Sequence, residues 1–511
     1  MKKILTLLVV GCMMTPTYAQ HMTGEPDSNF NSNGFKFWDA GKAEGLSDVA
    51  VDDLGYIWSV GSQYNPDGMI LVTRLQPDGQ IDPSFGTNGI LTINPNANED
   101  ESGLGIILLV DGTAVIATVN YASNSDITLY RIMKNGTVDP NWGNGGKMVI
   151  DESNSDVFGR LILDSQGRIV LVGTTKGNMD NDILIARIKS NGQIDSSFSV
   201  DGVTVVDLGT TNNTGQDLVE SPNGGYYVVS TADDNRSYIY SVSSNGNGRL
   251  DFNNKSYFSY QFGTDITQLK RILVDSAGNI LMGGRVEIAG NRDALLVRVK
   301  SNGNVDLSFN ASGSATFYPF PANQKDENVI DMKFQDDGKI LFITMYGPQE
   351  YAIFRVKPDG TKDPFFGNNN GFYKGSPDAN INFFSMNAME FTSVDSQAVI
   401  VGNIYLGPVD YLYYHAFYYD TDKPSSGENT GIENSGINSL SVFPNPGCGR
   451  FHVSFPNEGT GTIRVYSADG RLVHQTSDTQ EMNLDYLANG LYHVIANQGG
   501  NQYRTQIQIL H

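Results

Sequence analysis

The sequence is poor in cysteine, in histidine and in positive charge. It has 2 cysteines, 6 histidines, and 34 lysines and arginines against 56 aspartates and glutamates, giving a net charge of −22. One cysteine, Cys12, lies in an apolar leader, so Cys448 has no partner for an intrachain disulfide. The deficit of positive charge argues against nucleic acid and anionic membranes as partners, because both bind basic patches.

Histidine is missing from residues 22–414, since the six histidines are His21, His415, His452, His474, His493 and His511. This distribution excludes a Ser-His-Asp or Cys-His nucleophile and a histidine-based zinc site from that region. A carboxylate mechanism like that of glycoside hydrolases stays open, but no pair stands out among 56 acidic residues. We therefore expect no catalytic residue, no metal ligand and no cofactor.

Long hydrophobic runs are missing after the leader. Met1–Lys3 followed by the apolar Ile4–Val10 has the form of a secretory signal peptide, and we expect cleavage after Ala19, which makes residues 1–19 the leader. The alternative is that Val9–Cys12 is a lipobox whose cysteine carries a lipid. No later apolar segment is long enough to span a bilayer, so we expect no transmembrane segment.

What the sequence has is a repeat. Seven aspartates stand 55–57 residues apart: Asp27, Asp82, Asp139, Asp195, Asp251, Asp306 and Asp363. A period held this tightly indicates one supersecondary unit built seven times.

Five copies share an arginine, a turn glycine, an aspartate and an aromatic residue, in that order. The arginines are Arg74, Arg131, Arg187, Arg298 and Arg355, the aspartates are Asp82, Asp139, Asp195, Asp306 and Asp363, and the aromatics are Phe85, Trp142, Phe198, Phe309 and Phe366. Asp-Gly and Asn-Gly turns are typical of hairpins, and the arginine and aspartate that flank one hairpin can pair across it. Because the pair recurs, we interpret it as a fold element rather than an active site.

Each repeat contains about four short strands, which predicts an all-β, seven-bladed β-propeller over residues 20–420. The chain enters on half a repeat and leaves on the complementary half. We therefore expect residues 34–38 to pair with residues 411–419 and close the ring, which removes open sheet edges. The aromatics of 411–419 are expected to pack between blades rather than to form a sugar-binding platform.

The pattern Arg-x4-Gly-x2-Asp-x2-Phe-Gly resembles the delta-60 repeat, a bacterial propeller repeat with no assigned activity. The resemblance covers roughly residues 27–420 and implies a fold and nothing catalytic. Asp52, Asp164 and Asp275 each precede a turn glycine by three residues. We interpret them as turn caps rather than as calcium or catalytic groups.

The composition changes at residues 421–437, which predict a flexible linker, and residues 438–511 predict a small Ig-like β-sandwich. Three segments of this domain carry a second resemblance, through Pro444, Asn445 and Pro446, then Asp469 and Gly470, then Gly490 and Tyr492. They resemble the signature segments of the type A C-terminal sorting domain of the type IX secretion system. The resemblance implies that residues 438–511 engage that machinery and that the protein is released or displayed at the surface.

These observations favour a monomeric, secreted or surface-displayed, non-enzymatic propeller that binds an extracellular polysaccharide or protein. Loops that differ between repeats are the expected contacts: 63–68, 176–181, 232–236, 286–291 and 347–350. Two alternatives stay open at this point. One is a carboxylate-dependent glycoside hydrolase or lyase, and the other is a structural surface or adhesion component.

Overall fold

The computed structural model describes residues 23–509 except 41–42, 65–66, 96–98, 122–123, 153–154, 178–179, 210–211, 319–326, 348, 368–369, 378–382, 393–395, 407–408, 420–440, 444–449, 455–460, 468–471, 477–480, 489 and 499–500. The chain divides into two compact units, residues 1–425 and 426–511. The division falls within the expected linker.

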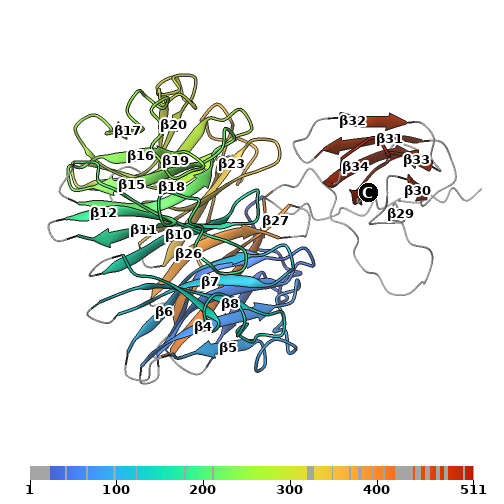
Figure 1. Cartoon of the computed structure of the whole chain (residues 1–511), viewed down its shortest axis with the longest axis horizontal. Coiled ribbons are helices and arrows are strands. Elements are labelled where there is room, and N and C mark those ends of the chain that lie inside the picture. The colour runs from blue at the N-terminus through green and yellow to red at the C-terminus, as the bar shows by residue number, and fades with distance from the viewer. Residues whose placement is uncertain are drawn as a thin grey trace, which may run out of the picture. The chain divides into compact units, whose positions relative to one another are not determined.

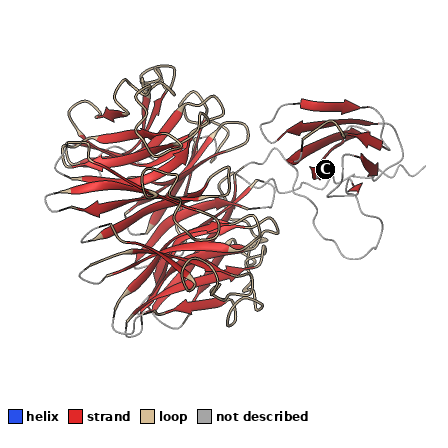
Figure 2. Cartoon of the chain, viewed as in Figure 1, coloured by secondary structure: helices blue, strands red, loops and turns tan. Residues whose placement is uncertain are grey.

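The first unit is a ring of seven four-stranded antiparallel sheets, and its described residues contain no helix (Figure 1, Figure 2). Blades 1 to 3 are β2 (Ala43–Val51), β3 (Ile57–Tyr64), β4 (Gly68–Leu75) and β5 (Ile90–Ile93); β6 (Glu101–Leu108), β7 (Ala114–Asn120), β8 (Ile127–Ile132) and β9 (Lys147–Ile150); β10 (Asp156–Leu163), β11 (Ile169–Lys176), β12 (Asn181–Ile188) and β13 (Val203–Val206). The predicted all-β, seven-bladed propeller is confirmed.

Blades 4 to 7 follow the same order. They are β14 (Asn213–Glu220), β15 (Tyr226–Ala232), β16 (Ser237–Val242) and β17 (Tyr257–Tyr260); β18 (Ile266–Val274), β19 (Ile280–Ile288), β20 (Asn291–Val299) and β21 (Ser314–Phe317); β22 (Val329–Phe334), β23 (Ile340–Tyr346), β24 (Glu350–Val356) and β25 (Phe372–Gly375); β26 (Phe383–Phe391), β27 (Gln397–Leu406), β28 (Val409–Tyr418) and β1 (Phe35–Trp38).

The ring closes where the sequence predicts. The first strand in the chain, β1, is the outer strand of blade 7, with Phe35 opposite His415 and Trp38 opposite Leu412 on β28. Asp27 extends the contact, because its N–H donates to the carbonyl oxygen of Ala416 at 2.8 Å. This pairing covers the edge of β28 that would otherwise be open to another strand.

The core of the propeller lies between neighbouring blades. Val170 and Val172 of blade 3, for example, share one buried cluster with Leu218 and Val228 of blade 4. The middle strands are therefore buried on both faces, and β11 has seven consecutive buried residues. Valine and isoleucine suit such strands because branched side chains pack well on a pleated surface.

The second unit contains a three-stranded sheet, β29 (Ser441–Phe443), β30 (Arg450–Ser454) and β33 (Glu481–Asn483), and a four-stranded sheet, β32 (Leu472–Thr476), β31 (Gly461–Ser467), β34 (Gly490–Gln498) and β35 (Asn501–Ile509). Residues of both sheets, including Phe451 and Val494, form one buried cluster. Within the described residues no helix is long and apolar enough to cross a membrane.

Candidate functional site

The propeller has two faces that differ in chemistry. Because each blade is antiparallel, the turns joining first to second strand and third to fourth strand lie on one side, which we call the turn face. The connections joining second to third strand, and each blade to the next, lie on the opposite side, which we call the loop face. In blade 1 the turn face carries residues 52–56 and 76–89, and the loop face carries the connection after Tyr64.

The repeated arginines and aspartates lie on the turn face and bond to each other. In four blades the arginine Nε donates to the aspartate Oδ2 at 2.6–2.8 Å: Arg74 to Asp82, Arg187 to Asp195, Arg298 to Asp306 and Arg355 to Asp363. Burial favours the neutral carboxyl, but hydrogen bonds from a nearby serine and the arginine keep the pKa of Asp82, Asp195 and Asp306 below its usual value. These three carboxyl groups therefore stay ionised beside their arginines.

The same arginines reach two further groups. Each guanidinium lies 4.7–5.0 Å from the ring centre of the aromatic residue of its own repeat, namely Phe85, Phe198, Phe309 and Phe366. Each also donates to a carbonyl oxygen of the following blade, for example Arg187 to Ser244. An arginine held in this way joins adjacent blades, which is a structural role.

Blade 2 has the same arginine, aspartate and aromatic positions, but these residues contact different partners. Arg131 lies 3.4 Å from Asp139 and also pairs with Asp111, and its side chain is 20% exposed. Trp142 makes the contact with the next blade instead, donating from Nε1 to the carbonyl oxygen of Ser190 at 2.8 Å. The position of the aromatic group is retained while the donor to the next blade has changed.

The innermost strands place a second set of charges around the ring axis. Each of the seven has a β-bulge at the same level, and the residues just after it are Asp48, Gly105, Arg160, Asp217, Arg271, Asp331 and Ala388. A bulge redirects a side chain and locally increases the twist of the strand. Five of these seven positions carry a charge.

The three axial aspartates bond to the next blade. Asp48, Asp217 and Asp331 each accept the backbone N–H of the neighbouring inner strand, at 2.9–3.1 Å. Arg160 lies 3.4 Å from Asp48, and Arg271 lies 3.6 Å from Asp331. Although burial opposes its charge, Arg160 has a raised pKa because the carboxylates of Asp48, Asp331 and Asp217 surround it.

This axial network is the feature that the sequence interpretation missed. Each of its five charged residues lies four positions before a turn residue of its strand pair, as Asp48 precedes Asp52. Asp52, Asp164 and Asp275 accept turn N–H groups, as expected of caps. A comparison, across all repeats, of the residue four positions before this turn residue would have revealed charged residues whose sign changes from repeat to repeat.

Exposed aromatic side chains concentrate on the loop face. Tyr64, Tyr121, Tyr318, Phe383 and Tyr405 are 40–58% exposed, and all lie at strand ends on that face. Phe383 and Tyr405 are opposite each other in blade 7. On the turn face of the described propeller the exposed aromatic residue is Phe365, at 79%.

Tyr64 and Tyr121 lie around one aspartate at the junction of blades 1 and 2. Asp100 accepts the N–H of Gly68 on its carboxylate and the N–H of Tyr121 on its backbone oxygen, at 2.5 and 2.8 Å. The ring of Tyr64 packs over Gly68, where an added Cβ would lie 3.0 Å from Tyr64 Cε1. Blades 7, 1 and 2 are consecutive in the closed ring, so four of the five aromatics occupy one sector.

One expectation about histidine needs correction. The stretch without histidine stops at residue 414, but the propeller continues, and His415 lies inside it on β28, fully buried. Burial lowers the pKa of His415 to about 3, and its ring stacks on Phe35 at 4.5 Å. A neutral imidazole among aromatic rings is a packing group. Tyr413, Tyr414 and Phe417 of the same strand are buried as well, as expected for packing between blades.

The described sorting residues lie in the second unit. Gly490 opens β34, and Tyr492 is buried there, with its hydroxyl donating to the carbonyl oxygen of Ala488 at 2.9 Å. Ala19, Cys12, Cys448, Pro444, Asn445, Pro446, Asp469 and Gly470 lie outside the described residues.

Two family models match the chain. Residues 441–510 match the secretion system C-terminal sorting domain. Residues 441–510 are a sorting domain. It directs export by type IX secretion to the cell surface or the extracellular space. Residues 165–198 and 278–309 match a beta-propeller domain of unknown function, DUF5122, which is consistent with the delta-60 repeat. No curated protein matches the chain.

Several solved structures are similar. The extracellular domain of a hybrid two component system from B. thetaiotaomicron has 11% identity and a TM-score of 0.42, covering 94% of this chain and 59% of that one. A protein of unknown function from Dyadobacter fermentans has 9% identity and a TM-score of 0.40, covering 75% and 99%. The polysaccharide lyase Uly1 has 8% identity and a TM-score of 0.44, covering 75% and 91%. The chain spans less than two thirds of the first of these.

Proposed function

We propose that this exported propeller is a non-enzymatic binding protein whose loop face holds a neutral polysaccharide. The observation that carries the proposal is the sector of exposed aromatic rings on blades 7, 1 and 2, formed by Tyr64, Tyr121, Phe383 and Tyr405. Large aromatic side chains at strand ends are usually buried, so several exposed together on one face favour a binding surface.

The chemistry of the sector suits a sugar chain. A flat aromatic ring offers an apolar surface to the C–H face of a pyranose, while its edge and hydroxyl remain available for polar contacts. Carboxylates such as Asp100 can accept hydrogen bonds from sugar hydroxyls. A net charge of −22 disfavours a polyanionic ligand, which is why a neutral polysaccharide is preferred over a charged one.

A second candidate function rests on the axial carboxylates. Burial raises the pKa of both Asp48 and Asp217, the direction that a general acid of a glycoside hydrolase requires. Against this, both carboxylates accept an N–H of the next blade, and Arg160 lies between the axial acids. Groups engaged in this way support the ring, so binding without catalysis is the stronger proposal.

Affinity electrophoresis of the mature protein through gels containing a panel of neutral polysaccharides tests the proposal. We expect retardation in at least one gel, and replacing either Tyr121 or Tyr405 with alanine should weaken binding about tenfold, since a stacked ring contributes about 1.4 kcal/mol. Phe365→Ala is the control, because it removes an even more exposed ring, 79% against 58% for Tyr121, from the turn face.

Two outcomes would contradict the proposal. Absence of retardation in every gel would favour a protein partner or a structural surface role. Equal losses in the Tyr121 and Phe365 variants would show that the loop face is not where the ligand binds. Release of shortened products during the same incubations would instead support the hydrolase candidate.

A further inference from the structure

We propose a calcium site where the loop face joins blades 2 and 3, formed by the carboxylates of Asp126, Asp151 and Asp156. Asp126 immediately precedes β8, Asp151 immediately follows β9, and Asp156 opens β10. The three residues therefore come from three different strand ends, two in blade 2 and one in blade 3. The site does not depend on the proposed polysaccharide ligand.

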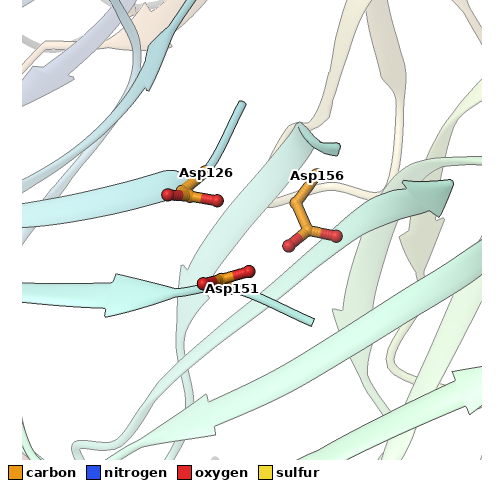
Figure 3. A group of neighbouring side chains, drawn as sticks. All are labelled: Asp126, Asp151 and Asp156. Carbon is orange, nitrogen blue, oxygen red and sulfur yellow. The ribbon is translucent and has the colours of Figure 1, made fainter. Parts of the chain in front are cut away.

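The geometry of the group fits a calcium ion. One carboxylate oxygen from each residue lies within 4.8 Å of the others, and Figure 3 shows the three carboxylates around one space. Calcium binds oxygen ligands at about 2.3–2.6 Å, so two of its ligands are separated by up to about 5 Å. A single ion can contact all three oxygens without any rearrangement of the strands.

The carboxylate of Asp156 supplies an independent observation that points to a cation. Its side chain is fully buried, and Oδ2 accepts the N–H of Glu152 at 2.7 Å. Its other oxygen, Oδ1, is buried without a hydrogen-bond partner, as is Oδ1 of Asp126. In Figure 3 the carboxylate of Asp156 turns toward Asp126 and Asp151. Buried carboxylate oxygens nearly always have a donor or an ion, which an ion in this space would provide.

The charges around the group point to a cation. No ion pair among the described residues includes any of the three aspartates. Three carboxylates this close together repel one another. A divalent ion would relieve this repulsion, and ligands made only of oxygen favour calcium over zinc, which prefers histidine and cysteine.

A related group one repeat later provides a natural control. Asp182 and Asp207 lie 56 residues after Asp126 and Asp151, and with Asp180 they form a second set of neighbouring carboxylates. The residue that opens the inner strand there is Asn213, so the fully buried carboxylate of Asp156 has a neutral counterpart. Oδ1 of Asp182 is also buried without a partner, but no carboxylate of the second group is fully buried, so we assign the ion to the first group alone.

The site is tested by titrating the metal-free mature protein with calcium chloride in a calorimeter. We expect one calcium per chain. Asp151→Asn should weaken binding about tenfold or more, because affinity follows the number of charged ligands, and Asp151 is exposed enough for the fold to survive the change. Asp182→Asn is the matched control and should bind as the unaltered protein does.

Thermal unfolding gives a second readout that does not rely on heat of binding. An ion that binds only the folded state raises the Tm, so calcium should raise it for the unaltered protein and for Asp182→Asn but not for Asp151→Asn. The proposal is overturned if millimolar calcium produces neither heat nor a Tm shift. It is also overturned if Asp151→Asn behaves like the unaltered protein, or if magnesium binds as tightly as calcium.

Discussion

At the scale of single residues, the turn-face arginines act through several partners at once. Arg187 is 1% exposed and bonds to Asp195, to Ser197 and to a carbonyl oxygen of the next blade, with its guanidinium over Phe198. The contact of Arg187 with Asp195 follows from their spacing across a hairpin. The contact with the next blade does not follow from local sequence, because its acceptor lies 57 residues away.

Replacing Arg187 with methionine should therefore strongly lower the free energy of unfolding. The change keeps the apolar stem but leaves Asp195 as an uncompensated buried charge, which costs about 3 kcal/mol. Chemical unfolding followed by circular dichroism measures the loss. Arg131→Met is the control, since this more exposed arginine should contribute about 1 kcal/mol or less. Equal losses in the two variants would disprove the importance of burial.

The burial of His415 predicts that the stability of the fold decreases as the pH is lowered. Its folded-state pKa is about 3, while an exposed histidine titrates near 6.5. Below pH 6.5 the unfolded chain binds a proton that the folded chain does not, so stability is lost by about 1.4 kcal/mol per pH unit down to about pH 3. In His415→Phe this loss is absent. The variant should gain stability over the unaltered protein as pH falls from 7 to 4 in urea titrations, and parallel pH profiles would contradict the prediction.

At the scale of elements, hairpins and their turns follow closely from the sequence. Asp-Gly and Asn-Gly turns, flanked by branched and aromatic residues, predict strand pairs wherever they occur. The docking of one blade's hairpin on the neighbouring blade does not follow from this local turn chemistry. Gly136 of blade 2 has a φ of +77° and lies against the backbone of Gly86 in blade 1, where an added Cβ would come within 2.3 Å of Gly86 N. Glycine is needed at position 136 because the backbones of the two blades touch there.

A comparison of Gly136→Ala with Gly167→Ala separates the cost of the backbone conformation from the cost of the close approach between blades. Gly167 has a similar φ of +73°, but an added Cβ there meets nothing within 4 Å. Gly167→Ala should cost about 1–2 kcal/mol from backbone conformation alone. Gly136→Ala should cost clearly more, because blades 1 and 2 must also move apart. Differential scanning calorimetry gives both values, and equal Tm losses would mean that the close approach is unimportant.

At the scale of the whole molecule, the chain combines a closed ring with an export signal. The seven-fold period predicts the number of blades, and the half repeats at the two ends of the ring predict its closure. Only part of the candidate site could be predicted from the sequence. The recurrence of the turn-face residues predicts their structural role. Of the loop-face aromatics, only Tyr64 lies in a loop that the sequence predicts as a contact, 63–68. The axial positions recur in every blade, but the residue type at these positions changes, so the repeat pattern does not mark them. Tyr121, for example, has no counterpart that a repeat pattern would mark.

Removing residues 438–511 should stop export while leaving the propeller folded. The sorting domain is recognised by the secretion machinery, and its core is separate from the buried clusters of the blades. Cell fractionation should find the truncated protein inside the cell envelope instead of at the surface or in the medium. A full-length Tyr121→Ala variant should be exported normally. Surface delivery of the truncated protein would contradict the role of the domain.

The all-β class, the seven blades, the closing strand and the sorting domain can all be predicted from the amino-acid sequence. Each of these depends on local strand and turn chemistry repeated at a fixed interval, which a single chain displays in order. The folded ring, in contrast, is what brings Asp48, Arg160 and Asp331 together at the axis, and Asp126, Asp151 and Asp156 together at one junction. Closing the ring brings different blades together, and electrostatic contacts depend on distance in space rather than on position along the chain.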